Sequence, residues 1–289
     1  MVSDDTGALV TTAWLGDHLD APDVRVVDAS WYLPQSGRNG HEEYQSAHIP
    51  GAVFFDIDDT CDTDSDLPHM LPSAEKFSSR VRRMGLGDGN RIIVYDGSGC
   101  LSAARVWWMF RVFGHNDVAV LDGGFPKWRA EGRPVEDLPA HPRERHFTAR
   151  LNTLMVRDLK QMQANVINAR EQVLDARSGA RFAGTEPEPR SGLPGGHIPG
   201  STSVPYMELL DPVDQTFLPT ELLRETLIGR GIDLDRPIIT TCGSGVTAAI
   251  ISLALHAIGC SNTALYDGSW AEWALRENQS ENGADRETG

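Results

Sequence analysis

Two similar stretches of the sequence decide the fold: IIVYDGSG at residues 92–99 and IITTCGSG at residues 238–245. Each begins with a short apolar run rich in β-branched residues, which is typical of a buried strand. A glycine-containing loop follows, and then an apolar segment of helical length, at 101–113 in one half and 246–258 in the other. The same strand, loop and helix are therefore expected in both halves of the chain.

The duplication extends beyond these stretches. Three further pairs of motifs keep the same order: VVDA at 26–29 with VLDA at 173–176, HIPG at 48–51 and again at 197–200, and LDG at 121–123 with YDG at 266–268. Partners lie about 147 residues apart throughout. A repeat of this length indicates two copies of one domain.

Strands that alternate with helices predict an α/β fold in which each copy is a parallel sheet flanked by helices. We predict a non-catalytic domain at residues 1–140, a linker at 141–155 and a catalytic domain at 156–289. Proline and charge concentrate at 133–142, which is typical of a linker. Ligands of such sheets bind at the carboxyl ends of the strands, and Cys242 follows one of these ends.

Composition excludes several classes of protein. The net charge of −15 argues against a nucleic-acid partner, and no apolar run reaches the roughly 20 residues that a bilayer requires. The acidic N-terminus lacks the features of a secretion signal, so we expect a cytoplasmic protein with no membrane contact. The four cysteines are far apart, which predicts free thiols rather than a metal site. We expect neither a metal nor a cofactor.

The loop after Cys242 predicts an anion-binding site. Its two glycines allow backbone N–H groups to point inward, and the following helix adds a partial positive charge. Such a cradle favours a thiolate, and it would equally stabilise an anionic persulfide. The alternative is a buried cysteine with a purely structural role. The first copy has Asp96 at the aligned position, so only the second copy can perform sulfur chemistry.

Together these motifs resemble the tandem rhodanese (sulfurtransferase) family, over residues 24–277. The loop CGSGVT at 242–247 resembles the 3-mercaptopyruvate sulfurtransferase branch, whereas the thiosulfate branch typically has arginine and lysine after the cysteine. The resemblance implies an inactive first domain and a Cys242 persulfide that passes its sulfur to a thiol, such as thioredoxin, or to cyanide, with release of pyruvate. It also implies a donor site lined by loop residues, namely Gly243, Gly245, Val246 and Thr247.

Two arginines are candidates for binding the substrate carboxylate. A guanidinium can grip two carboxylate oxygens at once, and the resemblance implies this role for Arg181 and Arg190. Taken alone, each is an ordinary surface or ion-paired arginine. For Arg177 we expect pairing with Asp175.

The resemblance further implies that His48 and Ser244 act with the cysteine. A histidine can move the proton that the departing pyruvate requires. However, HIPG occurs in both copies, which favours a structural turn for at least one of His48 and His197. The acidic partner that the family provides for this histidine has no clear counterpart at residues 38–43.

Three rival functions remain. A phosphatase of this fold needs arginine six positions after the cysteine, where this chain has Ala248. A non-catalytic sulfur carrier or docking module would not need an intact Cys242 loop. A thiosulfate sulfurtransferase is the nearest alternative, and the loop sequence together with Arg181 and Arg190 separates it from the mercaptopyruvate branch.

Overall fold

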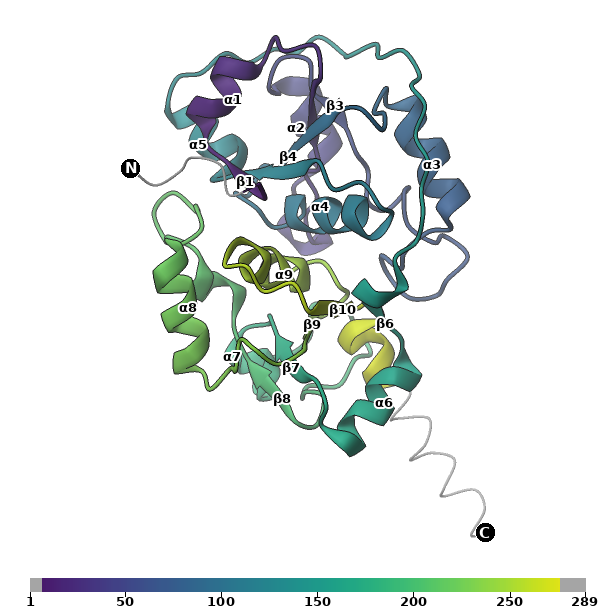
Figure 1. The fold of residues 1–289 in the computed structure, drawn as a ribbon, viewed down its shortest axis with the longest axis vertical. Coiled ribbons are helices and arrows are strands. Elements are labelled where there is room, and N and C mark those ends of the chain that lie inside the picture. Colours follow the sequence, from purple (N-terminus) through teal and green to yellow (C-terminus); the bar gives the residue numbers. More distant parts are fainter. Residues whose placement is uncertain (1–6, 276–289) are drawn as a thin grey trace.

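The computed structural model describes residues 7–275. Residues 1–6 of the predicted first domain and residues 276–289 of the predicted second domain lie outside this range. Two five-stranded sheets, each entirely parallel, form the two halves of the molecule (Figure 1). Their strand orders, β1-β5-β4-β2-β3 and β6-β10-β9-β7-β8, are the same pattern repeated. The predicted α/β fold of two tandem domains is therefore confirmed.

The first half contains the following elements in order: β1 (Leu9–Val10), α1 (Thr12–His18), β2 (Val24–Asp28), η1 (Pro34–Ser36), α2 (Gly40–Ser46), β3 (Val53–Phe54), α3 (Ala74–Arg83), β4 (Arg91–Tyr95), α4 (Ala103–Val112), β5 (Val118–Leu121) and α5 (Gly124–Ala130). Strand β4 lies between β5 and β2, where helices cover both faces of the sheet. This position explains why Ile92, Ile93 and Val94 are all buried and why the strand is a continuous apolar run.

The second half repeats this order: η2 (Thr153–Met155), β6 (Val156–Arg157), α6 (Leu159–Asn168), β7 (Gln172–Asp175), α7 (Gly179–Phe182), β8 (Ser201–Ser203), η3 (Tyr206–Leu209), α8 (Thr220–Gly229), β9 (Ile238–Thr241), α9 (Ala248–Ala257) and β10 (Thr263–Tyr266). Strand β9 has the central place that β4 has in the first sheet. The Cys242 loop, which we define as residues 242–247, joins β9 to α9.

The segment between the sheets has no regular structure beyond one bridge, in line with its prolines, but it lies against the first domain. Glu136 pairs with His48 in the bridge, and Phe147 is buried. Arg150 donates its backbone N–H to the Phe113 carbonyl. The connecting segment is therefore packed against the first domain along part of its length.

Helices α4 and α9 form the contact between the two domains, at the centre of Figure 1. Both are apolar on nearly every side, and residues of both belong to a single core cluster that spans the two halves. A helix that is apolar all round must be buried on all sides, and here the partner domain covers the outer face. None of the helices within residues 7–275 is long and apolar enough to cross a membrane. The cytoplasmic location stays a prediction.

Each domain also sends an arm to the other. The arm of the first domain, residues 55–73, lies between β3 and α3, and the arm of the second, residues 204–219, lies between β8 and α8. Leu71 in the first arm donates its backbone N–H to Asp267, at 2.7 Å, and Phe217 in the second arm donates to Asp122, at 2.8 Å. Because Asp122 and Asp267 are the aspartates of the repeated LDG and YDG motifs, the exchange is reciprocal.

Candidate active site

Cys242 lies at the carboxyl end of the central strand β9 and is 2% exposed. Its backbone N–H donates to the Ser269 hydroxyl at 3.3 Å, and its carbonyl accepts from the Trp270 N–H at 2.9 Å. The neighbouring Gly243 carbonyl accepts from the Ala271 N–H. These bonds fix the start of the loop from one side. The nucleophile predicted from the sequence therefore has a rigid backbone.

The first domain shows what the equivalent loop binds. Asp96 aligns with Cys242, and its buried carboxylate accepts the backbone N–H groups of Ser98, Ser102 and Ala103 at 2.7, 2.9 and 2.8 Å. Burial raises the pKa of Asp96, and these amide bonds oppose the shift. The loop of this fold is thus a cradle for a negatively charged group. In the second domain the residue at the same place is a cysteine.

Ser244 is the first member of a hydrogen-bonded chain that joins the two domains. Its hydroxyl lies 3.1 Å from Nδ1 of His69, although the two residues are 175 positions apart. The other ring nitrogen, Nε2, lies 3.0 Å from Oδ1 of Asp58. Both His69 and Asp58 belong to the arm of the first domain. The order serine, histidine, carboxylate is that of a proton relay.

The charges along this chain follow from the surroundings. Burial lowers the pKa of His69, and the bond to Asp58 only partly opposes that shift; the bond to His69 in turn lowers the pKa of Asp58. At neutral pH the imidazole is therefore neutral and the carboxylate ionised. An ionised Asp58 accepts the Nε2 proton, which leaves Nδ1 free to accept the Ser244 proton. The Trp31 indole N–H donates to the second oxygen of Asp58 at 2.8 Å.

The structure does not bring His48 to this site. Its ring is fully buried, Nδ1 is bonded to the Tyr44 carbonyl at 2.7 Å, and the ring stacks on that of Tyr44. His197 of the second HIPG motif makes the same pair of contacts, with the Phe182 carbonyl and the Phe182 ring. Both histidines thus fix a turn of the fold. The histidine beside Ser244 is His69.

Sequence reasoning missed His69, and the structure shows its counterpart in the other copy. His69 has φ 60° and Gln215, in the arm of the second domain, has φ 59°, so the two residues occupy the same strained place in the reciprocal arms. One copy has histidine there and the other glutamine, as one copy has Cys242 and the other Asp96. A difference between the copies marks the chemistry better than the shared HIPG motif does.

The two candidate arginines have different surroundings. The side chain of Arg181 donates to Glu188 at 2.5 Å, and Glu188 also accepts from the fully buried Arg177, which pairs with Asp175 as expected. Arg190 takes part in no hydrogen bond or ion pair among residues 7–275. Burial lowers the pKa of Arg190, and negative charge at Cys242 and at Asp58 acts against that shift. Arg190 is a half-buried cation, close enough to Cys242 and Asp58 for their charges to act on it, and it has no carboxylate partner within residues 7–275.

The remaining predicted residues line the same loop. Gly243 and Gly245 are buried, as is Val246, while Thr247 is half-buried. A Cβ atom on Gly243 would lie 3.0 Å from Nη2 of Arg181, which places that arginine directly against the loop. Gly245 has φ 78°, a backbone conformation that favours glycine. The loop is closely fitted to its neighbours, and it has little room for larger side chains.

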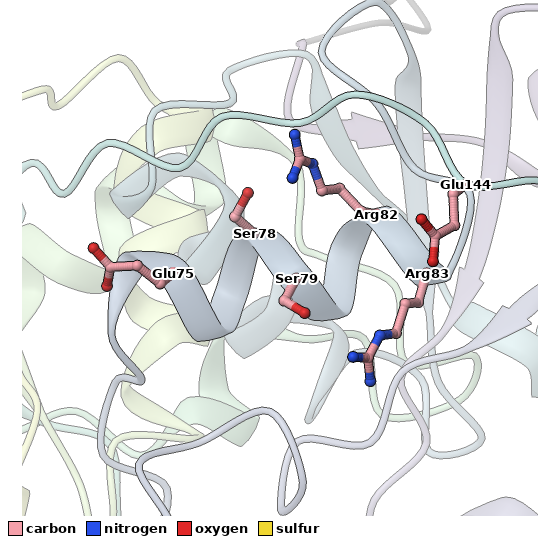
Figure 2. A pocket seen from close by; sticks show the side chains of 6 residues that line it. All are labelled: Glu75, Ser78, Ser79, Arg82, Arg83 and Glu144. Atoms are coloured by element: carbon pink, nitrogen blue, oxygen red, sulfur yellow. The ribbon is translucent and has the colours of Figure 1, made fainter.

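Two surface hollows lie away from this loop. The one in Figure 2, of about 410 Å³, follows the outer face of α3 and is lined by polar side chains: Glu75, Ser78, Ser79, Arg82, Arg83 and Glu144. A second, of about 610 Å³, lies beside Arg38 and Gly97 in the first domain. Neither is lined by a cysteine or by any residue of the Cys242 loop. The candidate site at Cys242 therefore lies apart from both hollows.

Comparison with known proteins agrees with this geometry. The model of the Rhodanese-like domain matches residues 11–131 and 156–276. The chain belongs to the rhodanese-like family. This rhodanese-like protein is 44% identical to "Thiosulfate/3-mercaptopyruvate sulfurtransferase 1, mitochondrial" of Arabidopsis thaliana, over 93% of its own length and 76% of the relative's. It is 41% identical to 3-mercaptopyruvate sulfurtransferase of Homo sapiens, over 93% and 92% of the two chains.

Among solved structures, the rhodanese-like protein resembles SseA from Escherichia coli, whose crystal structure is described for the rhodanese fold and catalytic mechanism of 3-mercaptopyruvate sulfotransferases. The TM-score is 0.84 at 39% identity, over 91% of this chain and 98% of that one. The likeness covers both domains. The tandem arrangement expected from the repeat is thus shared with an enzyme whose structure is known.

Proposed function

We propose that this rhodanese-like protein is a sulfurtransferase that takes sulfur from 3-mercaptopyruvate onto Cys242 and passes it to a thiol or to cyanide. The observation that carries the proposal is the convergence at one loop of a buried cysteine, a Ser244–His69–Asp58 chain and an unpaired cation, Arg190. A nucleophile, a proton relay and a carboxylate-binding group are what this reaction requires.

In the first half-reaction the Cys242 thiolate attacks the sulfur of mercaptopyruvate. An S–S bond forms, the C–S bond breaks, and its electron pair passes to the enolate of pyruvate. The donor's thiol proton ends on the methyl carbon of pyruvate, so the products are the persulfide anion and pyruvate. The cradle that holds the Asp96 carboxylate in the first domain would hold this persulfide in the second.

The Ser244–His69–Asp58 chain would carry that proton. Neutral His69 accepts it through the Ser244 hydroxyl, and the Asp58 carboxylate stabilises the resulting imidazolium. The proton then returns to the enolate along the same path. This assignment puts His69 in the role that the sequence had suggested for His48.

Arg190 would bind the substrate carboxylate, with Arg181 beside it. Of these two arginines, Arg181 is paired with Glu188, whereas Arg190 has no carboxylate partner within residues 7–275. Arg190 is therefore the main group that binds the substrate carboxylate in this proposal. Gly243, Gly245, Val246 and Thr247 would surround the sulfur. In the second half-reaction an acceptor thiol attacks the outer sulfur of the persulfide and releases the Cys242 thiolate; thioredoxin and cyanide are the acceptors to test.

Mass spectrometry of the intact protein tests the persulfide. After incubation with mercaptopyruvate we expect one added sulfur atom on the wild type, none on Cys242→Ser, and one on a Cys260→Ser control, because Cys260 lies beyond the opposite end of α9. Pyruvate release should require Cys242 in the same way. A sulfur label that persists in Cys242→Ser would exclude this mechanism.

Thiosulfate is the second candidate donor, because the relative from Arabidopsis thaliana is named for both donors. The loop of the present chain offers glycine and serine, rather than two cations, to a doubly charged donor. We therefore expect a higher kcat/KM for mercaptopyruvate when the two donors are compared side by side.

A further inference from the structure

Arg105, in α4 of the first domain, reaches the active site from the other side of the domain boundary. The residue is 1% exposed. Its Nη2 donates to the His69 carbonyl at 2.5 Å and to Oδ1 of Asp267 at 2.7 Å, and its Nη1 lies 3.4 Å from the Gly245 carbonyl. One guanidinium therefore contacts the backbone on both sides of the bond between His69 and Ser244.

Asp267 completes the arrangement. Its Oδ1 is bonded to Arg105, and its Oδ2 accepts the backbone N–H of Leu71, two residues after His69. Arg105 therefore holds the carbonyl of His69, and Asp267 holds the backbone N–H of Leu71, two residues further along the arm. This support matters because φ of His69 is 60°, a strained value for a residue with a side chain.

The duplicated half of the molecule provides an internal comparison. The second arm is held by the matching bond from Phe217 to Asp122, and its residue with φ 59° is Gln215. Counting back nine positions from Gly114 and from Gly259, the glycines after α4 and α9, gives Arg105 in one copy and Ile250 in the other. The second arm is held by its aspartate bond and by an ion pair between Lys127 and Asp214, at 2.7 Å, with no arginine at the place of Arg105. The arginine is present only where the arm carries the histidine.

We propose that Arg105 is a positioning residue for sulfur transfer: it sets the His69 imidazole against Ser244 and does not itself touch the substrate. A buried ion pair such as Arg105–Asp267 contributes little net stability, because the cost of desolvation offsets the attraction. We therefore attribute to it a role in positioning His69 rather than in stabilising the fold. The inference rests on the proposed function, since it assigns His69 the proton transfer.

The test compares two donors in matched variants. With mercaptopyruvate, Arg105→Lys should lower kcat roughly tenfold to 150-fold, the range of one lost charge-assisted hydrogen bond. It should leave KM nearly unchanged, because Arg181 and Arg190 are untouched. With thiosulfate, turnover should change little, because sulfite leaves as a stable anion and needs no proton from His69. Asp267→Asn should give the same pattern, and it provides the same test if Arg105→Lys does not fold.

Asp122→Asn is the matched control, because it makes the same change at the aspartate that holds the arm carrying Gln215. It should keep wild-type kinetics with both donors. Equal proportional losses for the two donors, an unchanged kcat in Arg105→Lys, or a comparable loss in Asp122→Asn would each overturn the role of Arg105. A wild type that releases no pyruvate from mercaptopyruvate would instead overturn the proposed function, so the two failures are distinguishable.

Discussion

Replacing Arg190 by lysine tests how the substrate is held. Lysine keeps the positive charge but loses the planar fork that grips two carboxylate oxygens. Because Arg190 has no ion-pair partner within residues 7–275, the substitution leaves no buried carboxylate unpaired. The expected loss is therefore that of one charge-assisted hydrogen bond to the substrate, about 1.5–3 kcal/mol. At about 1.4 kcal/mol per factor of ten, kcat/KM should fall roughly tenfold to 150-fold.

The assay should separate the contribution of the carboxylate contact to kcat/KM from that of the rest of the substrate. Mercaptoacetone has the same thiol and ketone as mercaptopyruvate but lacks the carboxylate, so it measures everything except this contact. Arg190→Lys should lower kcat/KM for mercaptopyruvate and spare the slower reaction of mercaptoacetone. Arg170→Lys, a change at an exposed position of the same domain, is the control. Equal losses on both substrates would refute the carboxylate contact.

Three further predictions concern the relay and the loop. His69→Gln should lower turnover of mercaptopyruvate by about 10²–10⁴, the usual contribution of a general acid–base group, whereas His48→Gln should lower the unfolding temperature and keep turnover. In the proposed mechanism neutral His69 is the active form, so kcat/KM should fall in acid as the imidazole protonates. In Asp58→Asn the imidazolium loses its stabilising carboxylate, so the pKa of His69 should fall further, and the acid limb of the pH profile should move to lower pH at a reduced rate. The double change Gly243→Arg with Ser244→Lys should raise the ratio of kcat/KM for thiosulfate to that for mercaptopyruvate, and an unchanged ratio in an active variant would exclude loop charge as the determinant.

The sequence predicts the sheets well, because local patterns determine them. The buried runs at 92–95, 118–121 and 238–241 are interior strands of the parallel sheets, and helices cover both faces of such strands. Gly114 and Gly259 follow the two interface helices with φ 90° and 87°, a backbone conformation common just after a helix. The position of Cys242 follows equally from the order strand, loop, helix.

The active site is less predictable, because its groups come from distant parts of the chain. Ser244 and His69 meet only because an arm of one domain crosses to the loop of the other, and no local pattern encodes that contact. The family resemblance pointed to His48, although the repetition of HIPG already favoured a structural turn for at least one of the two histidines. Repetition in fact indicates a role common to both copies, which here is the turn that His48 and His197 each fix.

The duplication explains why only one of the two loops is suited to the chemistry. In the first domain, Asp96 fills the anion cradle with a covalently attached carboxylate, so no substrate anion can enter. Because Asp96 occupies that loop, we expect the first domain to contribute to the proposed reaction through groups outside it, chiefly His69 and Arg105. The second domain contributes the cysteine and the two arginines proposed to bind the substrate, Arg181 and Arg190. Each sheet is complete by itself, yet the proposed proton relay exists only across the boundary between the domains, and sulfur transfer from mercaptopyruvate should therefore depend on their contact.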